Sequence, residues 1–318
     1  MKKLLLGILL TTGISAAFAQ QDAQFTHFFR NQLNYNSAFA GSEDGKICAT
    51  LIGRSQWLGF GSNEIGGSPQ SIGGNIHAPL FNGKLGIGLN ILTDQQGFEG
   101  TLTPTLSAAY HHTFSNQHIL SAGVGVGIIQ KSLNGKELKA QKQGDPSIPN
   151  QLVTGNSMDF NFGLYYKTQQ ISIFEKAYAG LSATHLNQAE VNYGSIKYTA
   201  ALHYYLMMGV VYDMGTFTIE PNILLKSAVK TTLDLNVMTT YNGNILGGVT
   251  YRTIDAIALL GGYKFSDNSS LMLSYDLTTS KLSQFSNGTV EISYKHCFKF
   301  KTEPPVKTFK PIYTPRFL

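Results

Sequence analysis

The residues that could carry chemistry are few, and their spacing does not suit catalysis. Gly123, Gly125 and Gly127 form a Gly-x-Gly-x-Gly run, but the lysine and hydroxyl side chains of a phosphate-binding loop do not follow it. Because the run lies within an alternating stretch, we expect its glycines to leave room for a packed segment or a strand bend. His111 and His112 are adjacent, so on a strand they point to opposite faces and cannot share a metal ion.

Two further groups of polar residues are no more specific. His185 and His203 could each serve a lipase-like Ser–His pair inside a barrel, but no spacing selects one of the nearby serines. Asp159, Asp234 and Asp276 are expected to be solvated wall groups or hydrogen-bonding groups rather than an acid–base pair. No His-Glu-x-x-His motif occurs in the sequence. We therefore predict a protein without enzymatic activity, and without a metal or other cofactor.

Cys48 and Cys297 are the only two cysteines in the sequence, too few for a cysteine-based zinc site. They lie near the two ends of the patterned region, and the alternation turns both away from their apolar neighbours. If the first and last strands of a barrel are adjacent, a disulfide could join them in an oxidising compartment. The sequence favours two unpaired small residues instead, because the register is not fixed and the geometry of such a bond is demanding.

Strands have to position these residues. Over residues 47–300, about fourteen stretches of about ten residues alternate apolar and polar side chains, as expected of a transmembrane β-barrel. A period of two gives each strand one apolar and one polar face. We therefore expect Leu106, Phe162 and Ile292 to face lipid and the polar positions to face the lumen. A soluble β-sandwich also alternates, but its strands are shorter and its loop lengths need not alternate.

We expect the connections between these stretches to alternate between short turns and longer loops, with the slightly longer turn at 168–175 as a mild exception. The short turns are rich in Gly, Asn and Asp, which tight hairpins need, and the longer loops span 58–69, 131–157, 187–199 and 278–287. Outer-membrane barrels keep short turns in the periplasm and long loops outside, and an even strand number returns both termini to the periplasm. Every second stretch ends on aromatic residues, which we predict to be the periplasmic girdle: Phe114, Tyr166, Tyr212, Tyr241, Phe265 and Phe300.

The two ends of the chain do not follow the strand pattern. A lysine pair, an apolar core and Ala17-Phe18-Ala19 predict a secretory signal peptide over residues 1–19, whereas a membrane anchor would need about twenty apolar residues. Residues 20–45 are polar and aromatic, and we expect them to fold into the lumen or its periplasmic mouth as a plug. Residues 301–318 are basic and Pro-rich, which predicts an extended periplasmic tail that acts as a spacer or as a recognition segment.

Composition supports a membrane barrel. Charged residues make up 14% of the chain, against about 25% in soluble domains. The formal net charge of +5 is too small to indicate nucleic-acid binding. An architecture of signal peptide, N-terminal segment, barrel over 46–300 and tail is therefore predicted.

Three short motifs resemble one known family. They are Gln-Asp-Ala-Gln-Phe at 21–25, Asn-Tyr-Asn-Ser-Ala-Phe-Ala-Gly at 34–41 and Arg-Ser-Gln-Trp at 54–57. These are similar to the start of the mature chain in the PorP/SprF family of type IX secretion outer-membrane proteins. Ala23 and Ser37 stand where that family usually has proline, and Phe39 where it has tyrosine.

The resemblance implies a FadL-like barrel that serves protein secretion and gliding motility at the cell outer membrane. Its expected partners are lipid, periplasmic ring or peptidoglycan-linked proteins of the secretion machine, and the C-terminal domain of a secreted adhesin. Residues expected to dock the N-terminal segment or a partner are Phe25, Phe28, Tyr35, Asn36, Phe39, Arg54, Gln56 and Trp57. Two alternatives remain open, a FadL-like transporter of hydrophobic small molecules and a general porin.

Overall fold

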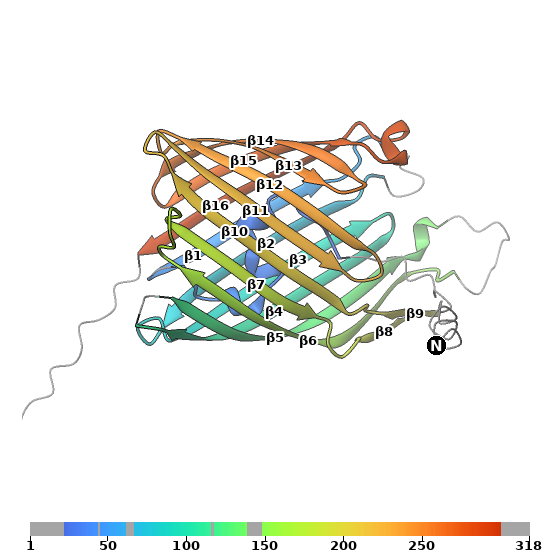
Figure 1. Cartoon of the computed structure of the whole chain (residues 1–318). Coiled ribbons are helices and arrows are strands. Elements are labelled where there is room, and N and C mark those ends of the chain that lie inside the picture. Colours follow the sequence, from blue (N-terminus) through green and yellow to red (C-terminus); the bar gives the residue numbers. More distant parts are fainter. Residues whose placement is uncertain (1–21, 44, 62–66, 116–117, 139–147, 300–318) are drawn as a thin grey trace, which may run out of the picture.

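The protein is a closed barrel of fourteen antiparallel strands (Figure 1). The computed structural model describes residues 22–43, 45–61, 67–115, 118–138 and 148–299. The predicted signal peptide (1–19), Phe300 and the predicted tail (301–318) lie outside these residues. The barrel strands are β1 (Lys46–Ser55), β2 (Gln70–Leu80), β3 (Leu85–Gln96), β4 (Glu99–Thr113), β5 (Ile119–Asn134), β6 (Leu152–Thr168), β7 (Lys176–Thr184), β10 (His203–Asp213), β11 (Phe217–Ser227), β12 (Thr231–Tyr241), β13 (Ile245–Arg252), β14 (Ala256–Ser266), β15 (Ser269–Thr278) and β16 (Thr289–Lys299).

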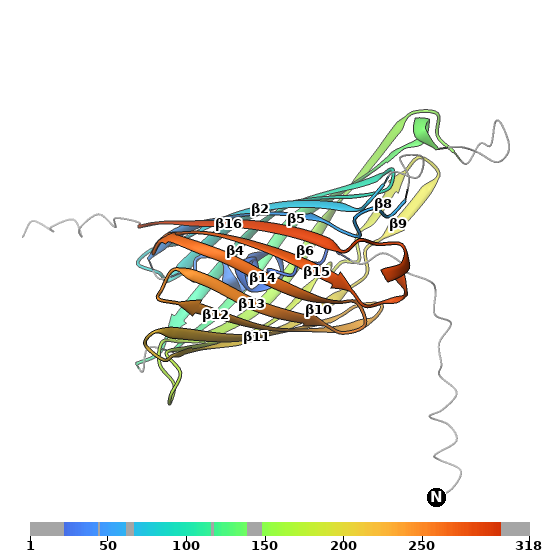
Figure 2. The same cartoon turned by 90° about the horizontal axis from the view of Figure 1, so that it is seen from above.

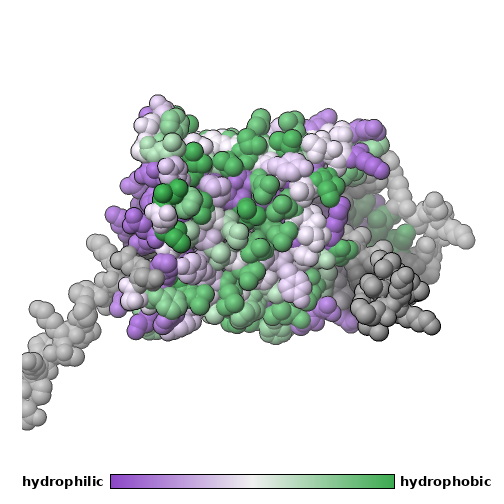
Figure 3. All heavy atoms as spheres, in the orientation of Figure 1, coloured by the Kyte–Doolittle hydropathy of each residue, from purple (hydrophilic) through white to green (hydrophobic). Residues whose placement is uncertain are grey.

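Sheet order follows chain order around the ring, and β1 pairs with β16 to close it. The alternation predicted from the sequence is confirmed: Leu106, Phe162 and Ile292 point outward and are 66%, 43% and 46% exposed. On the face that Figure 3 shows, apolar side chains cover the middle of the outer wall, and hydrophilic side chains gather toward its two ends. A band of this kind is the surface that a barrel presents to lipid, so the protein is an outer-membrane protein.

Among the described residues, no helix combines the length and the apolar character needed to cross a membrane.

The two ends of the barrel differ in their connections. We call the end where β1 begins and β16 ends the turn end, and the opposite end the loop end. Apart from residues 169–175, connections at the turn end are short, and Asn82, Gly83 and Asn242 adopt the left-handed backbone of tight hairpins there. At the loop end the predicted alternation of short turns with longer loops is only partly right, because residues 97–98, 228–230 and 253–255 are also short connections.

Two of the predicted long loops contain residues that belong to β-strands. β5 continues to Asn134 and β6 begins at Leu152, so the loop predicted at 131–157 is shorter than expected. Within the predicted loop 187–199, β8 (Glu190–Tyr193) and β9 (Ile196–Thr199) form a separate hairpin. Val191 and Tyr193 of the hairpin pack with Ile129 and Leu133 of β5, and this packing explains why both elements extend beyond the barrel wall (Figure 2).

The predicted aromatic girdle maps to strand ends at the turn end. Phe114, Tyr241 and Phe265 are exposed there, while Tyr166 and Tyr212 are half-buried. The Tyr166 hydroxyl forms a hydrogen bond with Nδ1 of His118, the residue before the neighbouring strand β5. Their role in setting bilayer depth remains a prediction.

A disulfide closes the seam of the barrel. Cys48 of β1 lies directly opposite Cys297 of β16, with their Cα atoms 4.0 Å apart, and the two sulfurs are bonded. The preference for unpaired cysteines was therefore wrong, because the strand register places the two residues face to face on the inner side of the wall.

Candidate functional site in the lumen

The lumen contains a stretch of the chain that we call the lumen segment, residues 22–42. It folds into three short 3₁₀ turns, η1 (Phe28–Arg30), η2 (Gln32–Asn34) and η3 (Ser37–Phe39). The Asn36 side chain caps η3 by accepting a hydrogen bond from Ala38 N at 2.9 Å. The segment lies inside the ring of strands in both views (Figures 1 and 2).

The lumen segment runs along the barrel from the loop end to the turn end. Asp22 lies 3.1 Å from His185, which follows the last residue of β7 at the loop end. At the other end, Ser42 O accepts a hydrogen bond from Lys167 near the end of β6. The even strand number brings β1 and β16 together at the turn end, as predicted. The segment before β1, however, starts at the opposite mouth. Both ends of the chain lie outside the described residues, so the prediction that they share the periplasmic side stays a prediction.

A buried network of charges holds the start of the lumen segment. Both Glu291 carboxylate oxygens accept backbone hydrogen bonds, from Thr26 N at 2.8 Å and His27 N at 2.7 Å. Arg54 pairs with Glu291 at 2.8 Å and with Asp276 at 3.0 Å, and all three charged side chains are at most 2% exposed. Charges buried this deeply are stable only when they are paired and hydrogen-bonded. The network therefore fixes the position of the segment and also links the strands β1, β15 and β16 of the wall.

His27 is part of the same network. Its Nδ1 atom lies 3.4 Å from the Glu291 carboxylate and forms a hydrogen bond with Ser293 Oγ at 2.9 Å.

The lumen carboxylates Asp159, Asp234 and Asp276 are buried hydrogen-bonding groups. Asp234 is fully buried between Lys226 at 3.1 Å and Arg252 at 3.2 Å, and Asp159 and Asp276 are also buried. Of the two environments expected for them, the hydrogen-bonding one applies and the solvated one does not, because the lumen segment and paired cations take the place of water.

Aromatic side chains anchor the rest of the segment. Phe28 and Tyr35 pack with Tyr205, and the Tyr35 and Tyr205 rings lie 5.3 Å apart. Phe39 packs against Tyr165 of β6, with ring centroids 5.4 Å apart. Asn36 donates a hydrogen bond to Leu164 O at 2.9 Å, so a polar side chain fixes the segment between these aromatic contacts. Phe25 is fully buried.

Gln56 and Trp57 are positioned differently from Arg54. They follow β1 in the loop-end connection, where the Trp57 ring packs against Phe60 at 5.7 Å. Both line a cavity of about 810 Å³ at the loop end together with Ala23. Of the three residues expected to hold the segment from the first strand, Arg54 alone makes a hydrogen bond to it among the described contacts, to Thr26 Oγ1 at 2.9 Å.

Glycines on the inner wall make room for the segment. A Cβ atom on Gly123 would lie 2.5 Å from Ala38 Cα and N, and one on Gly163 would overlap the Asn36 side chain. The interpretation of Gly123 as space for a packed segment is thus confirmed. Gly127 faces Thr105 of the wall instead.

Substitution of Gly123 by valine should displace the lumen segment. The added carbons have no space beside Ala38, and overpacking of this kind costs about 1–3 kcal/mol. We expect faster proteolytic cleavage within residues 22–42 in the purified barrel, measured by mass spectrometry of the fragments. The matched control is Gly247→Ala, because a Cβ there meets nothing within 4 Å. Equal cleavage rates in the two variants would show that the segment is not packed against this wall.

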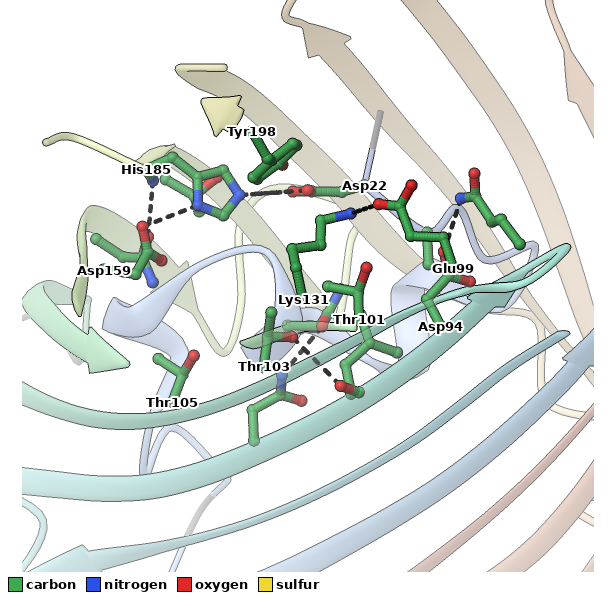
Figure 4. A pocket seen from close by; sticks show the side chains of 17 residues that line it. Asp22, Asp94, Glu99, Thr101, Thr103, Thr105, Lys131, Asp159, His185 and Tyr198 are labelled. Atoms are coloured by element: carbon green, nitrogen blue, oxygen red, sulfur yellow. Dashed lines mark hydrogen bonds and ion pairs between the residues drawn. The ribbon is translucent and has the colours of Figure 1, made fainter. Parts of the chain in front are cut away.

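A smaller polar cavity of about 80 Å³ lies beside the start of the segment (Figure 4). His185 points between two carboxylates there, with Nδ1 2.9 Å from Asp159 and Nε2 3.1 Å from Asp22. Lys131 pairs with Glu99 at 2.7 Å on the other side. Burial alone would lower the pKa of His185, but the Asp22 charge and the hydrogen bonds to both carboxylates raise it to about 10.

Sequence reasoning missed the grouping of Asp22 with His185 and His203. The three residues come from the N-terminal segment and from two sides of a long connection, and no sequence spacing relates them. Their proximity depends on the path of the lumen segment, for which the sequence carried no signal.

Comparison with known proteins places the fold and the family. A sequence profile of the family described as type IX secretion system membrane protein PorP/SprF matches residues 17–296. A search of curated protein sequences gave no significant match.

Several solved barrels are similar in fold. The CymD monoaromatic hydrocarbon channel is 12% identical with a TM-score of 0.51, covering 85% of this chain and 93% of that one. The Pseudomonas putida toluene transporter TodX is 10% identical with a TM-score of 0.50, covering 84% and 93%. A Pseudomonas aeruginosa FadL homologue is 12% identical with a TM-score of 0.47, covering 85% and 94%. At these identities the similarity of the first two shows a shared barrel fold.

Proposed function

The chain belongs to the PorP/SprF family of type IX secretion system membrane proteins, and from that premise we propose that it anchors or helps export a secreted surface protein. In this proposal the barrel is a non-catalytic scaffold in the outer membrane, and its lumen is closed by residues 22–42. The observation that carries the proposal is the buried Arg54–Glu291–Asp276 network, which binds the segment to the wall.

The lining of the lumen favours a scaffold function over a transport function. A path for hydrophobic molecules needs an apolar lining, whereas ion pairs and hydrogen bonds occupy this lumen around Arg54, Asp234 and Arg252. A general porin needs a water-filled channel, and the segment takes up that space. The transporter remains the second candidate, because the fold resembles a hydrocarbon channel and a toluene transporter.

The loop end offers the surface for a secreted partner. The extended β5–β6 pair and the β8–β9 hairpin project beyond the rest of the wall (Figure 2). If long loops face the cell exterior, as in other outer-membrane barrels, this projection meets the C-terminal domain of a secreted adhesin. The tail at 301–318 would then face the periplasmic ring or peptidoglycan-linked proteins.

Crosslinking in intact outer membranes, followed by affinity purification and mass spectrometry, tests this proposal. We expect recovery of a large secreted surface protein together with periplasmic secretion components. Replacement of residues 188–200 by a short Gly-Ser linker should abolish recovery of the surface protein and leave the periplasmic proteins in place. A Gly-Ser replacement of the short connection 228–230 is the matched control. Recovery of neither class by the unaltered chain would refute the proposal.

A further inference from the structure

One carboxylate and two imidazoles converge where the lumen segment begins. Asp22, His185 and His203 each offer one ligand atom, and these atoms lie within 4.8 Å of one another. The strand ladder fixes the two histidines, because His203 is the first residue of β10 and pairs with Thr184, the residue before His185. The carboxylate comes from the segment itself, so the set is complete only when the segment lies in the lumen.

The second nitrogen of each imidazole is already held by an acceptor. His203 Nδ1 lies 2.8 Å from the carbonyl oxygen of Ala201, which can only accept, so Nδ1 carries the proton and donates it. His185 Nδ1 lies 2.9 Å from Asp159 Oδ1 and donates in the same way. Metal-binding histidines are typically oriented by such a bond to a carbonyl or carboxylate, which leaves Nε2 as the ligand atom.

His203 Nε2 has no hydrogen-bond partner among the described residues, although it is buried. The residue as a whole is only 5% exposed. A buried polar atom without a partner is costly and calls for an explanation. With Nδ1 protonated, Nε2 presents a lone pair, and a bound cation would satisfy it.

We propose that Asp22, His185 and His203 bind one Zn²⁺ ion, which ties the start of the lumen segment to the barrel wall. Two imidazole nitrogens and a carboxylate oxygen are a common ligand set for zinc with an open fourth position. Ligand atoms around tetrahedral zinc lie roughly 3.3 Å apart, given bonds of about 2.0–2.1 Å. The distance of 3.1 Å between Asp22 Oδ2 and His185 Nε2 already fits this value. Binding of the ion therefore requires movement mainly of the His203 side chain.

The open position faces space that an ion or water can enter. Asp22 and His185 line the 80 Å³ cavity, and Asp22 and His203 line a second one of about 20 Å³. Tyr205 donates a hydrogen bond to Asp22 Oδ2 at 3.1 Å and holds the carboxylate in place. Metal binding at this site therefore stabilises the seated segment.

Zinc titration of the full-length protein tests the proposal. The protein is purified in detergent without a polyhistidine tag and stripped with EDTA, and Zn²⁺ binding is measured by competition with a chromophoric chelator. We expect one high-affinity equivalent, and Co²⁺ in its place should give the visible absorption of a four-coordinate ion. His203→Gln and Asp22→Asn should each weaken binding by at least about 100-fold, and Asp159→Asn by about 10–100-fold.

His112→Gln is the matched control, because this exposed histidine lies on the outer face of β4. It should bind zinc as the unaltered protein does. Heat-modifiable gel mobility checks that each variant retains the barrel. Binding by folded His203→Gln with unchanged affinity, or no stoichiometric binding by the unaltered protein, would overturn the proposal.

Discussion

Deletion of residues 22–41 should convert the barrel into an open pore. The interior of an eight-stranded barrel is filled by side chains of the wall, whereas barrels of sixteen strands leave an aqueous channel. With fourteen strands, the wall alone leaves space that the lumen segment occupies. Its removal exposes Arg54, Glu291 and Asp276 to water and leaves the outer face intact. We expect the single-channel conductance in planar lipid bilayers to rise on the order of tenfold or more.

A scrambled segment of the same composition is the matched control for this deletion. It keeps the length and charge of residues 22–41 but loses the contacts of Thr26, Asn36 and Phe39. We expect it to give currents that fluctuate between closed and open levels. A large, steady current from the unaltered chain would contradict a closed lumen and would support the porin alternative.

Substitution of Arg54 by methionine should be among the most destabilising single changes in the barrel. Arg54 is 1% exposed at its side chain and pairs with both Glu291 and Asp276. Methionine fills similar space but leaves Glu291 as a buried charge without its cation, and removal of one partner from a buried pair costs about 3–5 kcal/mol. Urea unfolding in detergent, followed by tryptophan fluorescence or gel mobility, measures the loss.

The control uses an exposed ion pair of similar length. Lys197 and Glu190 lie 2.8 Å apart on the β8–β9 hairpin, with side chains 59% and 54% exposed. Lys197→Met should change the free energy of unfolding by less than about 1 kcal/mol. A loss for Arg54→Met no larger than that of the control would show that the network does not hold the structure.

The barrel was predictable from sequence because lipid and lumen impose a period of two on every strand. The positions of Leu106, Phe162 and Ile292 followed from that period, and so did the number of strands. The connections at the loop end were less predictable. Two of them, at 97–98 and 253–255, reverse the chain within two or three residues, with Gly97 and Ile254 in the left-handed region. No local pattern marked the β8–β9 hairpin, whose stability depends on packing against β5.

The candidate site was harder to predict than the fold. The aromatic residues before β1 indicated a segment that needs shelter, and the residues at 25, 28, 35 and 39 are buried. The sequence did not indicate the direction of the segment, because its contacts join residues more than 100 positions apart, such as Asp22 with His185 and Thr26 with Glu291. The predicted roles of Gln56 and Trp57 came from a motif shared with the family, whereas their positions depend on the loop after β1.

The bond between Cys48 and Cys297 has a consequence for biogenesis. It turns residues 48–297 into a covalent circle, and the chain that precedes the circle passes through its middle, as in a lasso. Once the disulfide has formed around a closed barrel, the lumen segment could reach the loop end only by threading through the lumen past large aromatic side chains. We therefore expect thiol oxidation to be a late event of assembly, after the strands have closed around the lumen segment.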